Sequence, residues 1–368
     1  MNAMFRFSDS HMTFIRKSIA EREAVIAKDP DNLEAHYNRA LMLLSIGEFD
    51  EGWKEFEWRL KVPNSIFKYE WFPVPRWDGK DIAGKHVLVW LEQGIGDQVM
   101  AARCLPLLAD KAASVTLMAD RRFAPIFRRS FPNVEFYRTG DAVPERCLKW
   151  DFDCQLSISD LGQMFLTSFG NLYRGPYLKP DAAKVAALRA KYLNGENKSL
   201  VGFSWVSENA GFGGLKSIPP DKFSKLLGFE SNKYVSLQYG DHKTDLDYFR
   251  TINPDIIVDA SVDPLLSLDD SAAQIAAMDL VISVSNSTVH LAGAMGVKTC
   301  ALVPVGHGRV WYWHSEMAFS PWYPMVSVYR SEVPGEWDAP INNAWSRVLS
   351  ASMAHMRIEN IFKELVAA

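Results

Sequence analysis

The sequence has few cysteines, and their spacing excludes the common cysteine-based sites. The 368 residues include only Cys104, Cys147, Cys154 and Cys300. No two of them form the CxxC pair that structural zinc sites and thioredoxin-like redox centres use, and all four lie in apolar sequence. We therefore expect reduced, buried thiols, as in a cytoplasmic protein, and no structural metal.

Long apolar runs and a large net charge are absent as well. The most apolar stretch, 278–305, is interrupted by polar residues such as Asn286 and Lys298, so it indicates strands and a helix rather than a membrane span. The opening MNAMFRFSDSHMTF lacks the apolar core and cleavage site of a signal peptide. A net charge of −4 argues against nucleic acid as a partner. We expect a soluble, cytoplasmic protein without a transmembrane segment.

The first part of the chain has a helical pattern. Asp29–Leu60 shows apolar residues three and four apart, a break at Gly47, and the length of a tetratricopeptide unit, about 34 residues. An isolated repeat cannot bury both faces, so we expect a helix at Phe14–Lys28 on one side and the following domain on the other. Two interpretations stay open: a hairpin that caps a catalytic domain, and a repeat that binds a protein partner.

Two series of alternating strands and helices follow a segment rich in proline and tryptophan at 66–81, which we expect to be packed down. Such alternation is typical of parallel sheets flanked by helices. The first series has strands at 86–92, 115–120 and 134–140 and continues through 151–165; the second has strands at 199–207, 233–240, 280–285 and 298–305. A closing helix is predicted at about 342–365, packed back across the domains.

The sequence thus predicts an α/β fold with two Rossmann-like, doubly wound domains around a cleft and an N-terminal helical segment resembling a tetratricopeptide repeat. Ligands of doubly wound folds bind at the carboxyl ends of the strands, so we expect the ligand in the cleft. The predicted boundaries are 1–65 for the helical segment, 66–185 and 186–335 for the two α/β domains, and 336–368 for the closing helix.

The loop after the first strand, in EQGIGDQVMAARCLPLLA, has glycines at Gly94 and Gly96. They fit a dinucleotide fingerprint, but Val99 stands where its third glycine belongs. Asp97 at the helix start would also occupy the place of a pyrophosphate, which disfavours a nicotinamide enzyme. The helix start would keep the Asp97 carboxylate ionised, as a base for a hydroxyl requires; the alternative role is an N-cap.

The second domain offers a better place for an anion. In SVSNSTVHLAGAMG a strand ends, Asn286 or Ser287 can cap the next helix, and Ser287 and Thr288 offer N–H groups and hydroxyls. His290, one turn further on, can reach the same ligand or can be a packing residue.

Two more loops follow strands of this domain. A glycine-rich loop ends in Lys216, a cation suited to a phosphate or merely a solvated charge. In SLQYGDH, Gln238 can read the edge of a base or serve in a turn.

These motifs together resemble a known family. The helical hairpin, PRWDGKDIAGKHVLVWLEQGIGDQVMAARCLPLLA, GFSWVS, LKSIPP, SLQYGD, DLVISVSNSTVHLAGAMG and SPWYP are similar to bacterial tetratricopeptide-containing glycosyltransferases of the heptosyltransferase-like type, in glycosyltransferase family 9. The resemblance spans nearly the whole chain. It implies a GT-B fold and hexosyl or heptosyl transfer from a nucleoside-diphosphate sugar, with no metal and no further cofactor.

Carried over by motif, the resemblance makes Asp97 after Gly96 the candidate base and Lys216 the loop cation. The donor-binding helix start falls on Asn286, Ser287 and His290. The family commonly has Asp-Thr where this chain has Asn286-Ser287, so we expect position 286 to affect donor choice more than stability.

The expected reaction is a metal-independent, inverting transfer to a hydroxyl of a glycan, lipid-linked glycan or protein. Asp97 would remove the proton, while Ser287, Thr288 and Lys216 take up the charge of the leaving diphosphate. Two alternatives remain: a catalytically impaired nucleotide-sugar-binding or scaffold protein, and a nucleotide-sugar epimerase.

Overall fold

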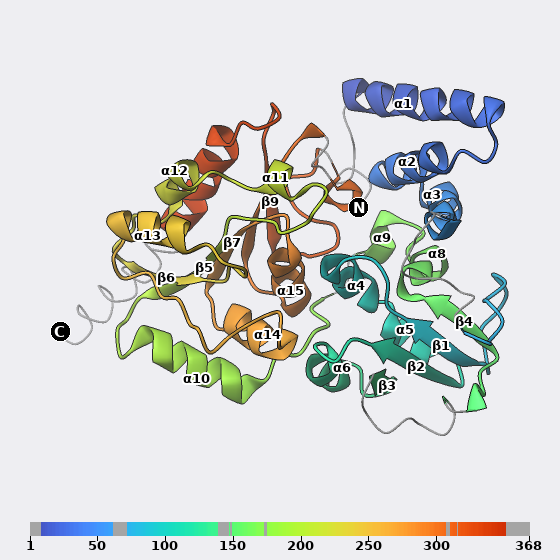
Figure 1. Ribbon diagram of the computed structural model, residues 1–368, viewed down its shortest axis with the longest axis horizontal. Helices are drawn as coiled ribbons and strands as arrows, with labels where there is room; N and C mark the ends of the chain where they lie inside the picture. Colours follow the sequence, from blue (N-terminus) through green and yellow to red (C-terminus); the bar gives the residue numbers. More distant parts are fainter. Residues whose placement is uncertain are drawn as a thin grey trace, which may run out of the picture. The chain divides into compact units, whose positions relative to one another are not determined.

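The computed structural model describes residues 9–61, 72–138, 147, 149–172, 175–306, 310–314 and 316–350. The chain divides into two compact units (Figure 1). Unit 1 comprises Met1–Arg174 and Val310–Met317, and unit 2 comprises Gly175–Arg309 and Ala318–Ala368. A short late segment of the chain therefore belongs to the first unit, which no sequence pattern predicted.

Unit 1 begins with helices that lie next to one another (Figure 1). They are α1 (Asp9–Lys28), α2 (Leu33–Ser45), α3 (Phe49–Phe56) and the 3-10 helix η1 (Glu57–Lys61). The Asn32 side chain caps α2 by accepting a 2.9 Å hydrogen bond from the Ala35 N–H. Gly47 has φ +86° between α2 and α3, so the predicted helix break is confirmed. That this segment is a tetratricopeptide unit stays a prediction.

The sheet of unit 1 is parallel, in the order β3-β2-β1-β4. Val87, Leu88 and Val89 of β1 are fully buried, as expected for a strand covered on both faces. The strands are β1 (His86–Trp90), β2 (Ser114–Ala119), β3 (Glu135–Arg138) and β4 (Cys154–Ser157); the helices are α4 (Ile95–Ala102), α5 (Leu105–Ala109), α6 (Ala124–Ser130), η3 (Ile158–Asp160), α8 (Leu161–Phe165), α9 (Phe169–Leu172) and, from the late segment, η6 (Trp311–Trp313).

The described part of the proline- and tryptophan-rich segment runs beside β4. The Trp77 N–H donates to the Gln155 carbonyl, and the Gln155 N–H donates to the Pro75 carbonyl, both at 2.8 Å. This part is packed down as predicted, and 66–71 lie outside the described residues.

The sheet of unit 2 is also parallel, in the order β6-β5-β7-β8-β9. The order reverses between β5 and β7, so their carboxyl ends mark the place where doubly wound folds bind ligands. The strands are β5 (Ser199–Ser204), β6 (Asn232–Ser236), β7 (Leu280–Val284), β8 (Thr299–Val303) and β9 (Val326–Arg330); the helices are α10 (Ala182–Leu193), α11 (Gly213–Lys216), α12 (Pro220–Phe223), η4 (Ser224–Leu226), α13 (Lys243–Ile252), α14 (Leu268–Ala276) and α15 (Ser287–Met295).

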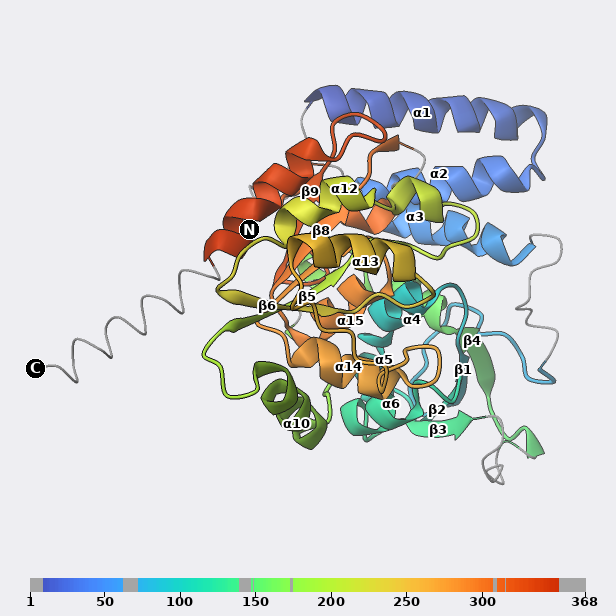
Figure 2. The same cartoon turned by 60° about the vertical axis from the view of Figure 1, so that its left-hand side comes forward.

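Helices cover both faces of this sheet (Figure 2), with α10 and α14 on one side and α12 and α13 on the other. Phe203, Phe223 and Phe249 form the aromatic part of the core beneath α12 and α13. Ile341 and Val348, from a helix that begins at residue 338, join the same cluster. Residues 351–368 lie outside the described residues, and the packing of the predicted closing helix across both domains stays a prediction.

Candidate functional site

In unit 1, Asp97 lies in the first turn of α4, directly after the glycine turn that follows β1. Gly94 is the N-cap residue, and a Cβ at this position would lie 3.2 Å from the Asp97 Oδ2 atom. The carboxylate therefore folds back over the turn, at the positive end of the helix dipole. Gly96 belongs to the same turn of α4.

The negative charge of Asp97 acts on two tyrosines from distant parts of the sequence. Burial raises the pKa of Tyr37, on α2, to about 12, and the negative charge of Asp97 adds to the effect. Burial, Asp97 and Tyr37 raise the pKa of Tyr312, on η6, well above its usual value. Both phenols are therefore protonated at neutral pH and can donate hydrogen bonds. Neither stands in a motif, so local sequence gave no signal for them.

A buried ion network fixes the loop that leads to Asp97. The Arg59 guanidinium of η1 donates to Glu92 Oε1 (2.9 Å from Nε) and to Asp160 Oδ1 (2.9 Å). The Ser157 hydroxyl accepts from Arg59 at 2.9 Å and donates to Glu92 at 2.6 Å. Burial lowers the pKa of Arg59, but the charges of Glu92 and Asp160 raise it by more, so the pKa lies above its usual value. The helical segment is thereby joined to the carboxyl ends of β1 and β4.

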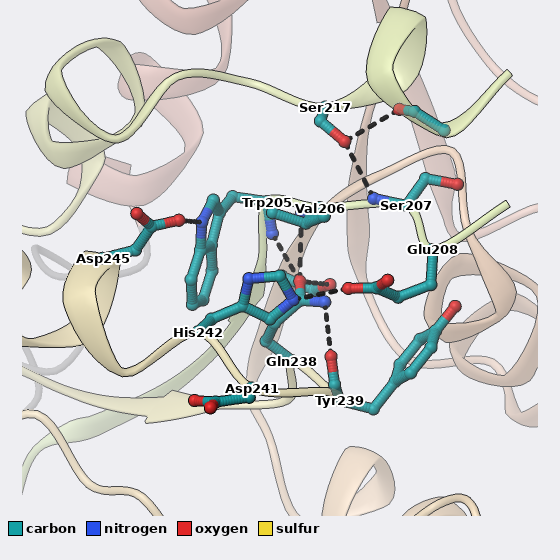
Figure 3. A network of polar contacts seen from close by, with 12 residues as sticks. Trp205, Val206, Ser207, Glu208, Ser217, Gln238, Tyr239, Asp241, His242 and Asp245 are labelled. Atoms are coloured by element: carbon teal, nitrogen blue, oxygen red, sulfur yellow. Dashed lines mark hydrogen bonds and ion pairs between the residues drawn. The ribbon is translucent and has the colours of Figure 1, made fainter. Parts of the chain in front are cut away.

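In unit 2, Gln238 joins the loops that follow β5 and β6 (Figure 3). Its Oε1 atom accepts hydrogen bonds from Ser204 Oγ (2.7 Å), Trp205 N (3.1 Å) and Val206 N (3.0 Å), while Nε2 donates to the Tyr239 carbonyl at 2.9 Å. The amide therefore holds the shape of the strand ends, and its role in reading a base stays a prediction.

Asn286 caps α15, as the sequence indicates, and it also hydrogen-bonds residues of β5, β7 and the loop after β5. Its Oδ1 accepts from Thr288 N and from the Ser283 hydroxyl, both at 3.0 Å. Its Nδ2 donates to Ser204 Oγ at 2.8 Å and to the Val206 carbonyl at 3.0 Å. An aspartate has no donor for these last two acceptors. The departure from the family pattern thus has a structural reason.

His290 lies on α15, and the charge of Lys216, the last residue of α11, acts on it. Both are buried, and His290 Nδ1 is 2.9 Å from the Tyr323 hydroxyl. Burial, with the nearby positive charge of Lys216, lowers the pKa of His290 to about 3, so this histidine is neutral. Ser287, at the helix start, hydrogen-bonds the Tyr239 hydroxyl. Direct ligand binding by Lys216, Ser287 and His290 stays a prediction.

Two side-chain contacts at the same edge of unit 2, an imidazole–carboxylate pair and an indole–carboxylate hydrogen bond, were not predicted. His242 Nε2 lies 2.6 Å from Glu208 Oε1, and Trp205 Nε1 donates to Asp245 at 2.7 Å (Figure 3). Both pairs join the loop after β5 to the start of α13, and tertiary pairing of this kind has no local sequence signature. No cluster of histidine, cysteine or acidic residues suited to a metal occurs among the described residues. Among the residues that the structure describes, no helix is long and apolar enough to cross a membrane.

Two parallel, helix-flanked sheets define an α/β protein, which confirms the predicted fold class, and solved structures share the architecture. A glycosyltransferase of family 9 from Veillonella parvula is similar with a TM-score of 0.51, 14% identity, and coverage of 75% of this chain and 98% of that one. The ADP-heptose lipopolysaccharide heptosyltransferase II of Escherichia coli is similar with a TM-score of 0.50 and 14% identity. The alignment covers 75% of this chain and 99% of that one. The fold is thus similar to that of family 9 glycosyltransferases, which is GT-B-like.

At the level of sequence, no family model matches the chain. Protein FlbA of Caulobacter vibrioides is 31% identical over 351 residues, which cover 88% of this chain. The aligned part is 58% of FlbA, so the chain spans less than two thirds of this relative's length.

Proposed function

We propose that the protein is a metal-independent, inverting glycosyltransferase that moves a hexose or heptose from a nucleoside-diphosphate donor to an acceptor hydroxyl. The proposal is carried by α15, which begins where the unit 2 strand order reverses, and by the buried cation Lys216, whose charge acts on His290 of that helix. The similarity of fold to family 9 glycosyltransferases supports it.

The donor would bind unit 2 through its diphosphate. The α15 dipole and the Lys216 ammonium supply positive charge, and the neutral His290 adds no competing charge. The Gln238 and Asn286 side chains keep the surrounding loops in place through their backbone contacts. Preorganised groups of this kind stabilise a leaving diphosphate without rearrangement during the reaction.

The acceptor step would use unit 1. Asp97 takes the proton of the acceptor hydroxyl as the oxygen attacks the anomeric carbon, and the bond from that carbon to the diphosphate oxygen breaks. The nucleoside diphosphate leaves with the electron pair, and Lys216 and the α15 start stabilise its charge. A single displacement inverts the anomeric centre. The acceptor would be a glycan, a lipid-linked glycan or a protein.

Nucleotide binding tests the donor half. Thermal unfolding with ADP, UDP, GDP, CDP and dTDP, each with EDTA present, should show stabilisation by one of them. A ligand at 100 times its dissociation constant adds about 2.7 kcal/mol. The gain should vanish in Lys216→Ala and persist in Lys243→Ala, which removes an exposed lysine of the same unit. If the diphosphate still stabilises Lys216→Ala, or if stabilisation strictly requires magnesium, the proposed donor binding is contradicted.

The substitution Asp97→Asn tests the acceptor half, because it keeps the side-chain shape and removes the proton acceptor. We expect turnover of the matching nucleotide sugar to fall roughly 10²–10⁴-fold. The diphosphate dissociation constant should stay unchanged. The alternative role of Asp97 as an N-cap is wrong, because Gly94 is the N-cap of α4. Lower stability with intact turnover would instead assign Asp97 a structural role in the first turn of the helix. Near-normal turnover therefore eliminates Asp97 as the base.

The hydrogen bonds of Asn286 weaken the argument for the alternative function, a catalytically impaired nucleotide-sugar-binding or scaffold protein. That alternative rests on the missing carboxylate at position 286, and Asn286 is needed there as a hydrogen-bond donor to Ser204 and Val206.

A further inference from the structure

The glycine-rich loop between β5 and α12 carries Lys216, the cation of the proposed donor site. We propose that Glu208 and His242 are positioning residues for this loop, and that their contact holds it in the shape that binds the donor diphosphate. This inference rests on the proposed function and adds to it two residues that act through the loop. Both residues belong to unit 2.

The end of the loop is fixed next to its beginning by Ser217. The Ser217 hydroxyl donates to the Gly213 carbonyl at 2.8 Å and accepts from the Ser207 N–H at 3.1 Å. A Cβ at Gly213 would lie 2.1 Å from the Ser207 carbonyl oxygen, so this close approach requires glycine. Lys216 is the neighbour of Ser217 in the chain, and its backbone is therefore fixed relative to Ser207.

The beginning of the loop is fixed on the start of α13 (Figure 3). Glu208 Oε1 lies 2.6 Å from His242 Nε2. The His242 ring meets the Trp205 ring edge-on, with centroids 5.6 Å apart. Trp205 is fully buried, and its indole N–H donates to Asp245 of α13 at 2.7 Å. His242 is therefore packed on a fixed part of the core and holds Glu208 in place.

The turn that follows β6 leaves room for the contact between Glu208 and His242. Gly240 in this turn has φ +90°, which favours glycine. A Cβ at Gly240 would also lie 3.1 Å from Glu208 Oε1 and 3.3 Å from His242 Nε2. The backbone of the turn and the two side chains are therefore closely packed, as expected for a contact with one defined geometry.

The middle of the loop is held less firmly than its two ends. Phe212 and Leu215 are each about half exposed, so apolar packing contributes little there. A Cβ at Gly214 would meet no atom within 4 Å, so packing does not require this glycine, which adds backbone freedom. Loss of the contact between Glu208 and His242 would free this stretch, and ordering it again on binding would lower the affinity for the diphosphate.

The exposure of the pair separates a positioning role from a role in folding. The Glu208 side chain is 44% exposed and the His242 side chain 15%. Ion pairs with such access to water contribute little to the stability of a fold. We therefore expect removal of the contact to change the dissociation constant of the diphosphate clearly and the melting temperature only slightly.

A double-mutant cycle of Glu208→Ala and His242→Ala tests the inference. The measurement is the dissociation constant, by titration calorimetry, of the nucleoside diphosphate that stabilises the protein. Each variant should bind it about threefold to tenfold more weakly. The double variant should bind no more weakly than either single one, because both changes remove the same contact. His242→Gln, whose amide can donate to Glu208, should keep most of the affinity. The Tm should fall by no more than about 4 °C.

Two controls belong to this experiment. Lys243→Ala and Asp247→Ala remove another exposed ion pair of α13 and should leave the dissociation constant unchanged. Hydrogen exchange without ligand reads the loop directly: the amides of residues 207–217 should exchange faster in His242→Ala than in the original protein, and those of β7 should not.

Three results would overturn the inference: additive losses of affinity, a loss in Glu208→Ala alone, or unchanged exchange of the loop amides. A loss in Glu208→Ala alone would make Glu208 a direct contact of the donor. Equal diphosphate binding by all variants refutes the inference and leaves the proposed function standing. If no nucleoside diphosphate binds the original protein, the proposed function itself fails.

Discussion

Position 286 shows how one side chain joins three loops. The Asn286 amide uses both its donor and its acceptor groups inside the protein, and it is 8% exposed. Ser204 Oγ accepts a hydrogen bond from Asn286 and donates one to Gln238. The carboxyl ends of β5, β6 and β7 are therefore joined by hydrogen bonds. Asn286 thus shapes the loops around it, and its effect on donor choice stays a prediction.

Replacing Asn286 by aspartate should therefore destabilise the fold. The carboxylate would face Ser204 Oγ and the Val206 carbonyl, and that carbonyl would lose its donor. We expect the free energy of unfolding in urea to fall by about 1–3 kcal/mol. Asn343→Asp, at an exposed position, should change it little. Equal stability of Asn286→Asp and the original protein would restore the earlier expectation that this position acts mainly on donor choice.

His290 should make stability depend on pH in a defined window. Its pKa is about 3 in the folded protein and about 6.5 when unfolded. The unfolded chain therefore binds the extra proton between these values, and stability falls as the pH drops from about 6.5 towards 3. His290→Gln should lose less stability over this range when urea unfolding is compared at pH 7 and pH 4. Carboxylates such as Asp338, with its pKa lowered to about 2, titrate alike in both proteins. Parallel curves would show that His290 is not neutral by burial.

At the scale of elements, the 3-10 helix η1 is joined to the sheet by charge rather than by apolar packing alone. Arg59 meets two carboxylates that are themselves buried, at Glu92 and Asp160. Removing one partner of such a network leaves unpaired charge away from water. The position of the loop before Asp97 depends on this element, which belongs to the helical segment.

We expect Arg59→Met to lower the free energy of unfolding by about 3–5 kcal/mol. The control is Arg16→Met in α1, whose ion pair with Glu48 is exposed and should contribute under about 1 kcal/mol. Chemical denaturation of the two variants beside the original protein makes the comparison. Similar small losses in both would mean that the Glu92 and Asp160 carboxylates find other partners.

The elements differ in how well local sequence specifies them. Strands such as β1 and β7 are continuous apolar runs between turn residues, and their prediction is confirmed. The cap of α15 by Asn286 is equally local. β9 was missed, because it is a short strand of five residues that follows a tryptophan-rich loop and is not preceded by a recognisable helix. Tyr37 and Tyr312 depend on packing between segments far apart in the chain, which periodicity does not encode.

For the whole molecule, the predicted α/β architecture with a helical N-terminal segment agrees with the structure, but the division of the chain does not follow sequence order. The boundary falls at Arg174 and Gly175, and Val310–Met317 belongs to unit 1. Both α/β units were visible in the alternation of strands and helices. The place of Val310–Met317 in unit 1 could not be predicted in this way, because it depends on contacts of His314 with α2 and of Trp311 with α3.

This assignment bears on how such proteins diversify. A stretch of DNA that encodes residues 1–174 does not encode all of unit 1, since Tyr312 and His314 lie within the coding sequence of the other unit. Recombination that exchanged unit 2 as one cassette would also replace Tyr312 and His314 of unit 1. A hybrid protein would keep the packing of unit 1 only if the incoming cassette brought a segment that fits α2 and α3.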